Sequence, residues 1–168
     1  KQSGALYIRS GIVLDPILFG GGQERSMRSG TENVPAIIGF AKSLEMAQQS
    51  RHTETERLKK LQSEFLAWLS ELDGVTVNGS LQKRLPNNIH ISIDGIDNER
   101  FVIQLDKLGY QVATGSACSA SHDEPSHVLE AIGLSESAIR ASVRISMGRF
   151  TTESDVRGLF DAIRSLLA

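Results

Sequence analysis

A long helical pattern constrains the fold of this chain more than any other feature of its sequence. Asn33 and Pro35 mark a helix start, apolar residues then recur at helical spacing as far as Leu72, and Gly74 ends the pattern. The sequence therefore predicts one long or broken helix of about forty positions. Polar residues 48–56 interrupt the apolar pattern, so we expect a boundary between two lobes within this helix.

Beyond this helix the apolar period changes from that of a helix to that of a strand. Isoleucines alternate with polar residues from Ile89 to Ile93, and the segment SVRIS alternates in the same way from Ser142 to Ser146. Thr152 and Asp155 form a capping-box-like pair at the start of a final amphipathic helix. Further strands are expected at 4–9, 75–77 and 111–113, with a helix at 98–108 capped by Asn98. The expected fold class is α/β, with α+β character in the C-terminal part.

Composition excludes several classes of function. The 18 basic and 20 acidic residues give a formal charge of −2 without long runs of one sign, so no nucleic-acid partner is expected. The longest uncharged apolar stretch, residues 34–41, is far shorter than the ~20 residues that cross a bilayer, so no membrane partner is expected either. The single cysteine, Cys118, excludes an intrachain disulfide and any zinc site with two or more cysteine ligands. We expect a reducing compartment, the cytoplasm.

Arg28, Ser29, Gly30 and Thr31 form a candidate anion site. They precede the predicted helix start, where unpaired backbone N–H groups and the helix dipole favour an anion. Arg28 adds a positive charge and Thr31 a hydroxyl group, and both suit a phosphate. The alternative is that Gly30 only shapes a turn and that Thr31 helps to cap the helix.

Cys118 lies in a segment of small residues that extends from Ala113 to Ser121. A lone cysteine is most often a buried filler, but this segment has no large apolar residues to bury it, which favours an exposed nucleophilic or sulfur-carrying thiol. His122 and His127 follow Cys118 and leave open a second hypothesis, a metal-binding module.

Arg144 lies at the centre of the predicted SVRIS strand. Val143 and Ile145 would face one side of the sheet, and Arg144 would face the other between two serines. A guanidinium held on a rigid strand suits a bidentate clamp on a carboxylate. A surface ion pair is the alternative.

Taken in chain order, the motifs resemble those of cysteine desulfurases, which are pyridoxal-phosphate enzymes of fold type I in the class V aminotransferase group. The matching segments are GALYIRSG at 4–11, GGGQERSMRSGTENVP at 20–35, RLPNNIHIS at 84–92, ATGSACSA at 113–120, EPSHVLEAIGL at 124–134 and VRISMGRFTTESD at 143–155. The region from Cys118 to Leu134 resembles the long-loop branch of the family. By this resemblance, residues 1–50 are the end of a large cofactor-binding domain and the start of a connecting helix, and residues 51–168 are a small C-terminal domain.

The resemblance also implies a role for each candidate residue. Cys118 would take sulfur from L-cysteine as a persulfide and leave L-alanine, while Arg144 would bind the substrate carboxylate. Thr31, with residues 28–30 beside it, would contact the phosphate of pyridoxal 5'-phosphate held by the neighbouring subunit, which implies a homodimer. Sulfur would pass to an iron–sulfur scaffold or another acceptor protein, and Cys118 would transiently ligate a [2Fe-2S] cluster.

The resemblance does not extend to the lysine that binds the cofactor in this family. The family's Schiff-base lysine would lie several residues upstream of Lys1, and Lys1 aligns with a different lysine. We therefore expect this 168-residue chain alone to hold no cofactor covalently and to release no sulfide from L-cysteine. The alternatives are a sulfur-carrier or metal-binding module that uses Cys118, His122 and His127, and a relative that cleaves selenocysteine.

Overall fold

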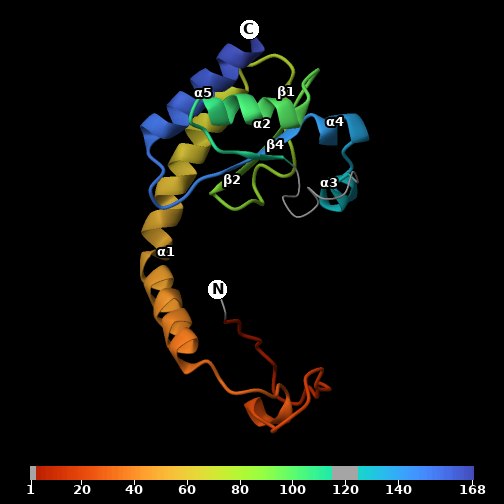
Figure 1. The fold of residues 1–168 in the computed structure, drawn as a ribbon. Coiled ribbons are helices and arrows are strands. Elements are labelled where there is room, and N and C mark those ends of the chain that lie inside the picture. Colours follow the sequence, from red (N-terminus) through yellow and green to blue (C-terminus); the bar gives the residue numbers. More distant parts are fainter. Residues whose placement is uncertain (1–2, 115–124) are drawn as a thin grey trace. The chain divides into compact units, whose positions relative to one another are not determined.

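The computed structural model describes residues 3–114 and 125–168. They belong to two compact units, Lys1–His52 and Thr53–Ala168. All the buried hydrophobic residues among them lie in the second unit, which also contains the sheet (Figure 1).

Helix α1 (Val34–Leu69) is continuous and confirms the predicted long helix. The Asn33 side-chain oxygen Oδ1 accepts a hydrogen bond from the Ala36 N–H at 3.2 Å and so satisfies one of the free N–H groups of the first turn. The helix buries residues only in its second half, namely Leu58, Leu61, Gln62, Phe65 and Leu69.

The second unit contains, among the described residues, one antiparallel sheet in the order β1-β2-β4-β3. The chain enters it through Gly74, whose φ of +73° suits glycine because an L side chain is strained there. The strands are β1 (Val75–Val77), β2 (Asn88–Ile93), β3 (Ala113–Thr114) and β4 (Ser142–Ser146). Strands β1, β2 and β4 agree with the sequence prediction, whereas β3 lies farther along the chain than the predicted 111–113.

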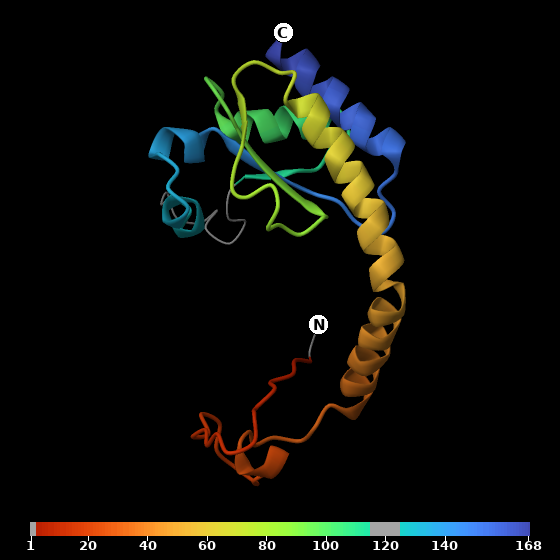
Figure 2. The same cartoon turned by 180° about the vertical axis from the view of Figure 1, so that it is seen from behind.

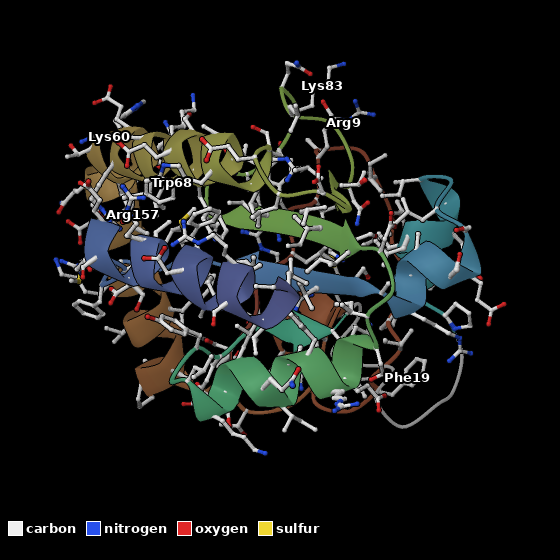
Figure 3. The ribbon with its side chains drawn as sticks, turned by 90° about the horizontal axis from the view of Figure 1, so that it is seen from above. Arg9, Phe19, Lys60, Trp68, Lys83 and Arg157 are labelled. Carbon is white, nitrogen blue, oxygen red and sulfur yellow. The ribbon has the colours of Figure 1, made fainter. Side chains whose placement is uncertain are left out.

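Helices α2 (Asn98–Lys107) and α5 (Glu153–Leu167) pack with the second half of α1 against one face of the sheet. In Figure 2 the strands lie in front of α2, with α1 and α5 beside them. The alternation of β2 and β4 aims Ile89, Ile91, Val143 and Ile145 into this core, and all four are at most 4% exposed. Figure 3 shows how α1 and α5 meet at their surface, where the Arg157 guanidinium lies 4.2 Å from the centre of the Trp68 ring.

The helix caps confirm one prediction and correct another. Thr152 and Asp155 form a capping box at the start of α5, as predicted. Asp97, not Asn98, caps α2 through its side chain. Asn98 instead donates from Nδ2 to the Ser142 carbonyl at 3.0 Å and ties the start of α2 to β4.

Two short helices were not predicted from the sequence. They are α3 (His127–Ala131) and α4 (Glu136–Arg140), and each is too short to show an apolar repeat. Ser92 of β2 donates its hydroxyl to the Ala138 carbonyl at 2.8 Å, which fixes α4 beside the sheet.

The first unit differs most from expectation. The predicted strand 4–9 is wrong, because no neighbouring strand pairs with this segment in the described part of the chain. The glycine-rich stretch is a loop, as predicted, except for the short 3-10 helix η1 (Glu24–Ser26). Two apolar residues of the predicted helical stripe, Ile38 and Leu44, are 63% and 60% exposed. No helix in the described ranges is both long and apolar enough to cross a membrane.

Candidate functional site

Arg144 lies on β4, on the sheet face opposite the apolar core. Its neighbours Val143 and Ile145 are buried in that core, and Arg144 itself is half-buried, as the alternation predicted. It pairs in register with His90 of β2 on one side and with Ala113 of β3 on the other. No carboxylate forms an ion pair with Arg144 within residues 3–114 and 125–168. The alternative of an intrachain surface ion pair therefore finds no support among these residues.

His90 is buried beside Arg144, with 9% of its surface exposed. Its Nδ1 atom lies 2.8 Å from the side-chain nitrogen Nδ2 of Asn78. The same nitrogen donates to the Ser92 hydroxyl at 2.9 Å. That hydroxyl in turn donates its own hydrogen to the Ala138 carbonyl. Since Ser92 can only accept from Asn78, the Asn78 amide must present its NH₂ group to both partners. Nδ1 of His90 therefore accepts, and the proton of the neutral ring is on Nε2.

The Nε2 atom of His90 is buried and has no hydrogen-bond partner among the described residues. Burial, followed by the positive charges of Arg144 and Arg84, lowers the pKa of His90 to about 4. The ring is therefore neutral near pH 7. Within residues 3–114 and 125–168 it presents a buried N–H donor without an acceptor, which is uncommon in folded proteins.

Arg84 adds a second guanidinium to this environment. It donates from Nε to the Ser80 carbonyl at 2.9 Å and from Nη2 to the Asn78 carbonyl, while its buried Nη1 has no partner in the described ranges. Burial lowers the pKa of Arg84. We call Arg84, His90 and Arg144 the donor cluster, because each offers N–H groups and none of the three is paired with a carboxylate in the part of the chain that the structure describes.

Gln62 of α1 positions the segment that carries Arg84. It is buried, and its Nε2 atom donates to the carbonyls of Leu85 and Asn88, each at 3.0 Å. These two bonds attach the entry to β2 directly to the long helix.

The predicted anion site at residues 28–31 lies in the first unit. Thr31 is exposed and makes no hydrogen bond with another described residue, while the helix cap is made by Asn33. The alternative that Thr31 caps the helix is therefore wrong. Gly30 has a φ of +120° and donates its N–H to Gln23 Oε1 at 3.0 Å, so this backbone group is already used.

The side chains of this loop nevertheless fit a phosphate. Arg28 is exposed and donates from Nη1 to the Ser29 carbonyl at 2.6 Å, which leaves its other N–H groups available. With the Thr31 hydroxyl it provides the charged and neutral donors that a phosphate monoester binds. The preceding residues Glu24, Arg25 and Ser26 all have positive φ, and backbone strain of this kind clusters at ligand sites.

The remaining candidates are only partly described. Cys118 and His122 lie outside the described residues. His127 is the first residue of α3 and is exposed. Within the described ranges, no group of three or more metal-ligating side chains gathers.

Sequence reasoning identified Arg144 and Thr31 but did not place His90 and Arg84 in a site. Both occur in the segment RLPNNIHIS, and His90 has the polar position of an alternating strand, as Arg144 does. That shared alternation was the available signal. The register that makes the two residues neighbours depends on strand pairing, which the sequence does not reveal.

Comparison with known proteins gives one consistent result. Residues 4–159 match the aminotransferase class-V family. The chain is 40% identical over 167 residues to cysteine desulfurase IscS 1 of Archaeoglobus fulgidus, and 39% identical to cysteine desulfurase IscS of Methanosarcina thermophila. Each alignment covers 99% of this chain but only 44% and 41% of the relative, so the chain spans about two fifths of their length. A NifS-like protein of known structure matches with a TM-score of 0.83 at 32% identity, over 96% of this chain and 41% of that one.

Proposed function

This chain belongs to the aminotransferase class-V family, and we propose from that premise that it is part of a cysteine desulfurase. The observation that carries the proposal is Arg144, a half-buried guanidinium on a rigid strand without an ion pair in the described ranges. The similarity to cysteine desulfurases over 99% of the chain supports an amino acid as the class of substrate.

Arg144 binds the carboxylate of L-cysteine. Its planar fork matches the two carboxylate oxygens, and β4 holds it against the core through Val143 and Ile145. The substrate thus enters with a fixed orientation, because its carboxylate is anchored to the sheet.

Cys118 takes up the sulfur. Its thiolate attacks the sulfur atom of L-cysteine, an S–S bond forms and the C–S bond breaks. The electron pair of that bond stays with the carbon, which takes up a proton as L-alanine, while Cys118 keeps the sulfur as a persulfide. Pyridoxal 5'-phosphate, when bound, supplies the electron sink for this chemistry.

Thr31 and Arg28 bind the cofactor's phosphate across a homodimer interface. Exposed apolar side chains such as Ile38 and Leu44 support an interface around this unit, because large apolar groups normally lose contact with water. In this proposal residues 1–50 end the large domain and residues 51–168 form the small one.

The persulfide passes to an iron–sulfur scaffold or another sulfur acceptor in the cytoplasm, and Cys118 transiently ligates a [2Fe-2S] cluster there. Similarity to the cysteine desulfurases named IscS supports the sulfur-transfer part of this proposal. The metal-binding alternative stays a prediction, because two of its three residues, Cys118 and His122, lie outside the described residues.

The full-length natural protein tests the proposal. With L-cysteine it should form L-alanine and gain the mass of one sulfur atom on the Cys118 peptide, and both products should disappear in Cys118→Ser. His127→Gln should behave like the unaltered protein. Stoichiometric zinc binding that depends on His127, without alanine formation, would establish the metal-binding module instead. Activity with L-selenocysteine alone would assign the chain to the selenocysteine-cleaving relatives.

A further inference from the structure

His90 has a donor that the proposed reaction does not yet use. We infer that the Nε2–H group of His90 is a second donor to the substrate carboxylate, beside the guanidinium of Arg144. This inference rests on the proposed function and adds a binding residue to it.

Strand pairing places the two side chains together. His90 and Arg144 are direct partners in the β2–β4 ladder, and both are on the face opposite the core. Residues directly opposite each other on antiparallel strands have Cβ atoms about 4.5–5.5 Å apart, which is close enough for one small anion to meet both.

The hydrogen-bond network fixes which atom His90 offers. Asn78 and Ser92 make Nδ1 an acceptor, so the free atom Nε2 carries the proton. A neutral imidazole N–H and a guanidinium are both donors and cannot bond to each other. One carboxylate can accept from both groups, because each of its oxygens has two lone pairs and can take a bond from His90 beside the bidentate contact with Arg144.

The charges around His90 favour an anion. Within the described residues, the charged groups that act on His90 are Arg144 of β4 and Arg84 of the segment before β2, and both are cations. Asn78 and Ser92, which also contact this region, are uncharged. An arriving carboxylate would be attracted by both cations and would supply the acceptor that Nε2 lacks among the described residues.

Two variants separate a donor role from a packing role. His90→Gln places an amide N–H near the position of Nε2, whereas His90→Leu fills similar space without a donor. The probe is L-alanine, which has the substrate's carboxylate and no reactive sulfur, added to the full-length protein after removal of pyridoxal phosphate. We expect His90→Leu to weaken L-alanine binding about tenfold, and His90→Gln to stay within about threefold of the unaltered protein.

A second readout does not depend on any variant. In protein labelled with ¹³C in the histidine rings, saturating L-alanine should raise the pKa of His90, because a carboxylate at Nε2 stabilises the charged ring. His52 is exposed on α1 and is the internal control, since its resonance should not respond. This titration decides the question even if His90→Leu fails to fold.

The outcomes distinguish the inference from the proposed function. If Arg144→Gln abolishes L-alanine binding while His90→Leu binds normally and the His90 pKa stays constant, the inference fails and the proposed function stands. If the unaltered protein does not bind L-alanine, or Arg144→Gln binds it normally, both fail.

Discussion

At the scale of single residues, the donor cluster shows how an ordinary strand pattern places two N–H donors side by side. His90 and Arg144 each occupy a polar position in an alternating strand, which usually means exposure to water. In this sheet His90 is buried instead, and its ring is kept neutral by burial and by two neighbouring cations. Stability is lost when such a group must accept a proton.

The pH dependence of stability follows from the two pKa values of His90. The pKa is about 6.5 in the unfolded chain and about 4 in the folded one, so the unfolded state binds more protons between these values. The stabilising contribution is complete above pH of about 6.5 and is lost as the pH falls toward 4.

Urea unfolding of the unaltered protein and of His90→Gln measures this contribution. Between pH of about 7 and about 4, the unaltered protein should lose roughly 2 to 3 kcal/mol more of its free energy of unfolding than the variant. The other histidines are common to both proteins and cancel in the difference. Equal pH dependence in the two proteins would show that His90 is not held neutral.

At the scale of elements, local patterns predicted most of the second unit. Alternation identified β2 and β4, and the helical period identified α1 and α5, because these elements bury a regular face in one core. The prediction of a strand at 4–9 was wrong because a strand also needs a partner. Leu6, Tyr7 and Ile8 suit a strand, but within the described chain no partner strand provides the hydrogen bonds that would define one.

The same distinction applies to the site. Arg144 was predicted from the alternation of its own strand, whereas His90 and Arg84 become part of the site only through register and loop path. Those depend on contacts between distant segments, such as the bonds from Gln62 to the carbonyls of Leu85 and Asn88.

Removing those bonds should loosen the connection between α1 and the donor cluster. Gln62→Met keeps an unbranched side chain of similar size but leaves two carbonyls without their donor. The free energy of unfolding should fall by about 2 kcal/mol, measured by urea denaturation. Ser63→Ala changes an exposed position on the same helix and should cost less than about 0.5 kcal/mol. Equal effects of the two substitutions would mean that the Gln62 bonds do not stabilise the fold.

At the scale of the whole molecule, the two units differ in how they are stabilised. The second unit has a continuous core of residues from α1, α2, α5 and the sheet. The first unit has no buried apolar residue among those described, and most of its large apolar side chains are exposed. This exposed apolar surface is compatible with the proposed dimer, in which a second subunit would cover part of it.

The central claim is that Arg144 binds the carboxylate of the substrate. The most direct test is the KM for L-cysteine of the full-length protein and of Arg144→Gln. Loss of a bidentate charged contact should raise KM about 100-fold, with a much smaller change in kcat. Arg140→Gln, which alters an exposed arginine paired with Glu136 on α4, is the matched control and should leave KM unchanged. A normal KM in Arg144→Gln would contradict the account.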